Sequence, residues 1–71
     1  MNTPSTTSTW TIAGMTCQHC VASVTEEIGE VDGVSEVVVD LPSGVATVTS
    51  STPLDAAVIR GAVEEAGYTL V

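Results

Sequence analysis

Hydrophobic residues along this chain follow two different spacings, and the order of these spacings leaves few folds open. Residues 9–13 ("TWTIA") alternate between polar and apolar with a period of two, which is typical of a half-buried strand. The next apolar residues, Val21, Val24, Ile28 and Val31, recur every three or four positions, as on one face of a helix. A strand followed by a helix is therefore predicted for the first half of the chain.

A hairpin is predicted for residues 37–48, where apolar residues alternate on both sides of a turn formed by Pro42, Ser43 and Gly44. The alternation places Val37, Val39 and Leu41 on one face of the first strand, and Ala46 and Val48 on one face of the second. These residues are expected to point toward the helices.

The next segment is typical of a second helix. Thr52 is expected to cap it, Pro53 to take its first position, and Asp55 to act as the acid of a capping box. Gly67 suits the end of this helix, and residues 68–71 predict a short last strand. The buried stripe of the helix is expected to consist of Val58, Ile59, Ala62, Val63 and Ala66.

The resulting order of elements predicts an α+β fold of the ferredoxin-like βαββαβ type, with a four-stranded antiparallel sheet and two helices on one face. One domain is expected at residues 9–71, preceded by a disordered polar tail at residues 1–8. A domain of 71 residues buries only ~60% of its unfolded surface. Such a small core, built mainly from Val and Ala, leaves little room for a catalytic cleft, so we expect a protein that is not an enzyme.

The charge of the chain is strongly negative, with nine acidic residues, a single basic residue (Arg60) and a net charge of −8. This balance excludes nucleic acid as a partner and predicts a protein partner with a basic face. The first nine residues resemble no signal peptide, and no apolar run reaches the ~20 residues of a membrane span. We expect a cytoplasmic protein without membrane insertion, in which the cysteines remain thiols.

Both cysteines and the only histidine lie within residues 14–20, "GMTCQHC". The predicted elements place this segment in the loop between the first strand and the first helix, with Cys20 in the opening turn. Unpaired N–H groups and the helix dipole favour a thiolate at such a position. A thiolate is both a nucleophile and a metal ligand, so the position alone leaves redox and metal-binding functions open.

Three kinds of chemistry compete for this cysteine pair. Thioredoxin-like redox motifs usually carry an aromatic residue before the first cysteine and often a proline between the two, whereas this chain has Thr16, Gln18 and His19. Structural zinc needs four ligands, and Cys17, Cys20 and His19 would supply at most three. Cu(I) binds stably with only a few thiolate ligands, which favours a metal-carrying loop. A thiol–disulfide oxidoreductase is the alternative.

The segment "GMTCQHC" resembles the G-M-x-C-x-x-C signature of heavy-metal-associated domains, and "GV" at 33–34 and "GY" at 67–68 extend the resemblance. Residues 9–71 look like a free-standing bacterial copper chaperone of this family. The resemblance implies that Cys17 and Cys20 bind Cu(I) and pass it on by thiolate exchange. The implied acceptor is the metal-binding domain of a copper-exporting P-type ATPase or, in some cases, a copper-responsive repressor.

An isolated N-terminal metal-binding domain of a heavy-metal ATPase is the second alternative. The chain is expected to be a monomer without metal, with a copper-bridged dimer as an open alternative. Because the cysteine loop must dock onto the acceptor, the two helices are expected to surround it with an acidic rim. That rim would consist of Glu26, Glu27, Glu30, Glu64 and Glu65.

Four further residues are expected to lie in or near the cysteine loop. Met15 is expected to pack inward and anchor the loop, as the matching methionine does in the family. His19 is expected to be exposed, and an auxiliary role at the metal stays open. Thr16 occupies a position where zinc-selective relatives tend to carry an acid, which favours Cu(I). Tyr68 matches a family position near the metal loop, and it either contributes to the site or only anchors the last strand.

Overall fold

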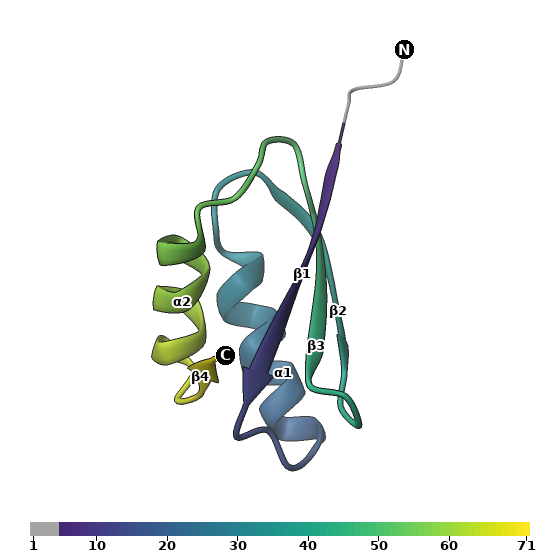
Figure 1. The fold of residues 1–71 in the computed structure, drawn as a ribbon, viewed down its shortest axis with the longest axis vertical. Helices are drawn as coiled ribbons and strands as arrows, with labels where there is room; N and C mark the ends of the chain where they lie inside the picture. Colours follow the sequence, from purple (N-terminus) through teal and green to yellow (C-terminus); the bar gives the residue numbers. More distant parts are fainter. Residues whose placement is uncertain (1–4) are drawn as a thin grey trace.

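Residues 5–71 are described by a computed structural model. They form two layers, one of helices and one of β-sheet (Figure 1). Both helices pack on one face of a four-stranded sheet with the strand order β2-β3-β1-β4, and all neighbouring strands are antiparallel. The predicted ferredoxin-like βαββαβ fold is thereby confirmed. In chain order the elements are β1 (Thr6–Ala13), α1 (Gln18–Gly29), β2 (Val34–Asp40), β3 (Val45–Ser50), α2 (Ala56–Glu65) and β4 (Thr69–Leu70).

The first strand begins earlier than expected. Thr6 pairs with Ser50 and Ser8 pairs with Val48, so residues 6–8 belong to β1 and are not part of a disordered tail. Threonine is a favourable strand residue, and β3 offers a full-length neighbour for pairing. Residues 1–4 of the expected tail lie outside the described residues.

The core is formed where the inner face of the sheet meets the two helices. Its buried members come from β1, β3, α1 and α2, and β2 contributes only partly buried residues. Val37 and Val39 of β2 pack against the cluster, as the predicted alternation requires. The buried residues of the core are Ile12, Val24, Ile28, Ala46, Val48, Ile59 and Val63.

Val58 departs from the predicted stripe, because its side chain is 48% exposed. Ile59 and Val63 are buried one helical turn apart and point to the sheet, while Ala62 and Ala66 pack at the edge of the cluster. Successive helical residues are rotated by about 100°, so a residue directly before a central core position lies off the buried face.

Helix α2 also begins later than predicted. Asp55 is its N-cap, and the Asp55 carboxylate accepts a hydrogen bond of 2.8 Å from the backbone N–H of Ala57. The predicted start at Thr52 and Pro53 is therefore wrong. The Thr52 carbonyl instead accepts a hydrogen bond of 2.7 Å from the Ser50 hydroxyl. Both residues are good N-caps, and the helix starts at the second of them because the backbone of Thr52 is hydrogen-bonded to Ser50 at the end of β3.

The end of α2 positions a side chain of the candidate site. Gly67 has a φ of 95°, and its N–H donates to the Glu64 carbonyl while the Tyr68 N–H donates to the Val63 carbonyl. These two hydrogen bonds form a Schellman motif, in which the residue with positive φ is usually glycine. The predicted helix stop at Gly67 is confirmed, and the reversal brings Tyr68 back toward the start of α1.

Candidate metal centre

The cysteine motif lies in the connection between β1 and α1, as predicted. Cys17 is the N-cap of α1 with an extended backbone, and its carbonyl accepts hydrogen bonds from the N–H groups of Cys20 and Val21. Cys20 therefore lies in the first turn of the helix, where backbone N–H groups are free to interact with a sulfur atom. Both sulfur atoms are thus fixed relative to the same helix end.

Gly14 allows the chain to leave β1 and enter this loop. Its φ is +101°, a conformation that residues with a Cβ rarely adopt. A Cβ at this position would also come within 3.3 Å of Cδ1 of Tyr68. Glycine therefore permits both the bend of the loop and the close approach of the Tyr68 ring.

The sulfur atoms of the two cysteines lie close together. The Cys17 Sγ and Cys20 Sγ are 3.6 Å apart, which is too far for a disulfide and close enough for both to bind one ion at the usual thiolate–metal bond length of ~2.3 Å. Cys17 is exposed, whereas Cys20 is only 8% exposed. The pair therefore combines one sulfur accessible from outside with one held against the protein.

The surroundings of Cys20 favour its thiolate. The backbone N–H of Thr16, 3.5 Å from Cys20 Sγ, is the main cause that lowers the pKa of Cys20 to about 6. Interaction with the Tyr68 hydroxyl lowers the pKa further, as do the backbone and side chain of Cys17, while burial opposes these effects. The same interaction with Cys20 is the main cause that raises the pKa of Tyr68, followed by burial and the charges of the two cysteines. Tyr68 is therefore part of the site's surroundings.

A pH titration of the reduced protein should reveal this thiolate. We expect the ultraviolet thiolate absorption of one of the two cysteines to appear with a midpoint near pH 6, and Tyr68→Phe to move that midpoint upward. The unfolded thiol binds its proton up to a pKa of 9.0, so the unfolded state carries more protons between pH 6 and pH 9. The melting temperature of the metal-free protein should therefore rise with pH across this window.

A Cys20→Ser variant provides the control for this titration, because it removes the early transition and leaves Cys17 in place. Its melting temperature should lose most of the rise between pH 6 and pH 9. Absence of a thiolate transition near pH 6 in the wild-type protein would contradict the assignment to Cys20.

The remaining residues of the motif take the positions predicted for them. Met15 is half-buried and packs against the hydrophobic core, so its predicted anchoring position is confirmed. His19 is exposed on the first turn of α1. Thr16 is also exposed, and besides its N–H its hydroxyl lies 3.8 Å from Cys20 Sγ.

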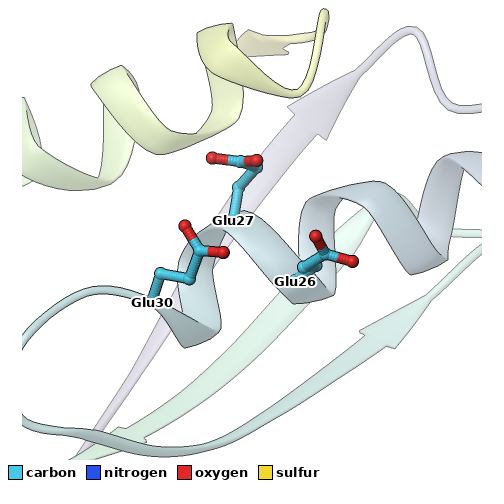
Figure 2. Close-up of side chains that lie close together, drawn as sticks. All are labelled: Glu26, Glu27 and Glu30. Carbon is cyan, nitrogen blue, oxygen red and sulfur yellow. The ribbon is translucent and has the colours of Figure 1, made fainter.

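Three glutamates form a cluster on α1 (Figure 2), beyond the helical turn that contains Cys20. Carboxylate oxygens of Glu26, Glu27 and Glu30 lie within 4.8 Å of one another. Burial is the main cause that raises the pKa of Glu27, followed by the charges of Glu30, Glu65 and Glu26. Glu27 is about 10 Å farther along the helix than Cys20, at 1.5 Å per residue. These three carboxylates therefore lie along α1 beyond its first turn, and their part in a docking surface around the cysteines stays a prediction.

Within residues 5–71, neither helix has the length and apolar character required to cross a membrane.

Comparison with known proteins now identifies the family. Residues 9–69 match the family described as "Heavy-metal-associated domain". This chain is a heavy-metal-associated domain. It is 44% identical over 59 residues to the COP-associated protein of Helicobacter felis, covering 83% of this chain and 89% of that protein. It is 41% identical over 58 residues to the copper chaperone CopZ of Bacillus subtilis, covering 80% and 84%.

The heavy-metal-associated domain is also similar to solved structures and to parts of larger proteins. A structure described as "CopZ metallochaperone" superimposes with a TM-score of 0.85 at 27% identity, covering 93% of this chain and all of that one. Copper-transporting ATPase 1 of Rhizobium meliloti is 40% identical over 57 residues, which is 80% of this chain and 7% of the ATPase. The domain therefore has relatives both among small free-standing proteins and within copper ATPases.

Proposed function

We propose that this domain is a copper chaperone that binds one Cu(I) through Cys17 and Cys20 and passes it to another protein. The observation that carries the proposal is the pair of sulfur atoms 3.6 Å apart at the start of α1, one exposed and one buried. Thiolates are the ligands that Cu(I) prefers, and two of them suffice for a small coordination number. The similarity to proteins named as copper chaperones supports the same function.

The difference in exposure between the two cysteines suits a transfer by ligand exchange. An acceptor thiolate would form a new copper–sulfur bond as the bond to the exposed Cys17 breaks, and a second exchange would then release Cys20. The copper remains Cu(I) throughout, and each displaced sulfur leaves as a thiolate that can take up a proton from water. The low pKa of Cys20 favours the form that holds the ion until the second exchange.

The proposed acceptor is the metal-binding domain of a copper-exporting P-type ATPase, and a copper-responsive repressor is a second acceptor. The similarity between this chain and segments of copper-transporting ATPases supports a partner of the same fold. Such a partner could present its own pair of thiolates on an equivalent loop. The proposal places the exchange in the cytoplasm, where reducing conditions keep both cysteines free.

We also propose that the protein is not an enzyme and that it is a monomer without metal. A net charge of −8 on every copy disfavours close association between two identical chains. Copper shared between two cysteine pairs would offset that repulsion, so a copper-bridged dimer is the alternative state to examine at high metal loading.

An anaerobic Cu(I) titration against a chromophoric chelator tests the proposal, with Zn(II) titrated in parallel. We expect one Cu(I) per chain, tighter binding of Cu(I) than of Zn(II), and copper transfer after mixing with an apo metal-binding domain of a copper ATPase. Tighter binding of Zn(II), or copper that stays with the chelator, would contradict a copper chaperone. Reduction of insulin disulfides by the dithiol form would instead support the oxidoreductase alternative.

A further inference from the structure

A surface cavity of about 410 Å³ lies where α1 ends and α2 begins. Its walls come from residues 30–32, which follow α1, and from residues 52–55 and Val58 at the start of α2. Figure 1 shows that this end of the helical layer is opposite the loop that connects β1 to α1. The cavity is therefore separate from the cysteine site.

The cavity combines an apolar lining with acidic groups. Val31, Leu54 and Val58 supply the apolar surface, and Val58 is one of the exposed large hydrophobic residues of the chain, at 48% exposure. Glu30 and Asp32 line the same cavity and are exposed. The carbonyl end of α1 and the N-terminal end of α2 both lie at this point, so their partial charges oppose each other and the negative charge comes from the side chains. An occupant would therefore meet apolar atoms inside and negative charge around them.

The negative charge continues beyond the cavity along the outer surface of α1. Glu30 belongs both to the cavity and to the cluster with Glu26 and Glu27, and Figure 2 shows Glu27 projecting from α1 toward α2. Arg60 is the only lysine or arginine in the whole sequence, so the chain has few cations to balance these carboxylates. A second copy of this chain, with its own charge of −8, would be repelled from the same surface.

We propose that this cavity docks a segment of another protein that presents an apolar side chain flanked by lysine or arginine. The apolar side chain would cover Val58 and Leu54, and its basic neighbours would pair with Glu30 and Asp32. Because the cavity and the cysteine loop lie at opposite ends of the helices, a docked segment leaves Cys17 accessible. The surface would thus hold a partner near the domain while the cysteines exchange metal. This docking does not require copper.

A peptide titration followed by two-dimensional amide NMR tests the docking surface in the reduced, metal-free protein. The probe is a blocked peptide of alternating lysine and leucine, and its matched controls replace every lysine by glutamine or every leucine by serine. We expect saturable shifts at Val31, Leu54 and Val58, with the amides of residues 15–20 unchanged. Both control peptides should bind on the order of tenfold more weakly, since each lacks one half of the complementarity.

Variants of the cavity provide a second readout. The double variant Glu30→Gln with Asp32→Asn, and separately Val58→Ser, should each weaken binding of the lysine–leucine peptide, the double variant on the order of tenfold. Glu36→Gln removes an exposed carboxylate of β2 outside the cavity and should leave the affinity unchanged. Equal affinity for the glutamine peptide, shifts confined to residues 15–20, or equally effective competition by spermidine would overturn the proposal.

Discussion

Replacement of either Cys17 or Cys20 by serine is expected to abolish tight Cu(I) binding. Serine keeps the approximate size of the side chain but substitutes a hard oxygen for the soft sulfur that Cu(I) prefers. The two sulfur atoms, 3.6 Å apart, are the proposed ligands of the ion. When one of them is replaced, a single thiolate remains to bind Cu(I). Loss of a residue that only supports a metal ligand lowers metal affinity about 10–100-fold. Loss of a ligand itself should lower the Cu(I) affinity by more than this.

Competition with a chromophoric chelator measures this loss, and two neighbouring residues supply matched controls. Met15→Leu preserves a packing role in the core, and His19→Ala alters an exposed side chain of the same turn. Both variants should still bind one Cu(I) per chain. Wild-type affinity in Cys17→Ser or Cys20→Ser would show that copper binds elsewhere, and circular dichroism would confirm that each variant is folded.

Truncation of Ile59 to alanine is expected to remove much of the stability of the metal-free domain. Ile59 is fully buried between α2 and the sheet, and such truncations cost about 2–5 kcal/mol. A domain of 71 residues has a free energy of unfolding of about 4–10 kcal/mol at 0.05–0.15 kcal/mol per residue. The variant should therefore unfold at a much lower urea concentration than the wild-type protein.

Val58→Ala is the matched control, because Val58 is the adjacent residue of α2 and is 48% exposed. Its midpoint of unfolding should stay near that of the wild-type protein. Cu(I) that binds only the folded state adds about 4 kcal/mol at 1,000 times its dissociation constant, and should therefore restore much of the stability of Ile59→Ala. Equal midpoints for Ile59→Ala and Val58→Ala would contradict the assignment of Ile59 to the core.

The hydrophobic spacing predicted most of the fold because the buried positions are periodic. Val24 and Ile28 are four positions apart, as are Ile59 and Val63, and each pair lies on the predicted buried face of its helix. The start of β1 could not be predicted in this way. Residues 6–8 are all small and polar, and their place in the sheet depends on pairing with β3, which is distant in the sequence.

The predicted start of α2 was wrong for a different reason. Thr52 and Asp55 are both good N-cap residues, and each is followed by residues that can form a helix. Local patterns alone do not decide between two such candidates. The structure selects Asp55, whose carboxylate bonds to the Ala57 N–H, while the Thr52 carbonyl pairs with Ser50 at the end of β3. The choice thus depends on how the preceding strand ends.

Within the candidate site, local residues were predictable and long-range neighbours were only partly so. The spacing of Cys17 and Cys20 before a helical stripe predicted their position at the start of α1. The contribution of Tyr68 to the pKa of Cys20 depends on the turn at Gly67, which returns the chain to the cysteine loop. The sequence left two interpretations of Tyr68 open because residue spacing contains no information about the distance between Tyr68 and the cysteine loop.

Strand β4 is an edge strand with two register pairs to β1, Ile12–Leu70 and Ala13–Thr69. Short edge strands open by local fluctuations at a much lower free energy than global unfolding, and their amide protons exchange with solvent accordingly early. Tyr68 directly precedes this strand, and its N–H also bonds to the Val63 carbonyl of α2. We therefore expect a local opening of β4 to loosen the contact between the phenol and the sulfur of Cys20. The better-covered cysteine therefore has access to a short-lived uncovered state while the rest of the sheet remains intact.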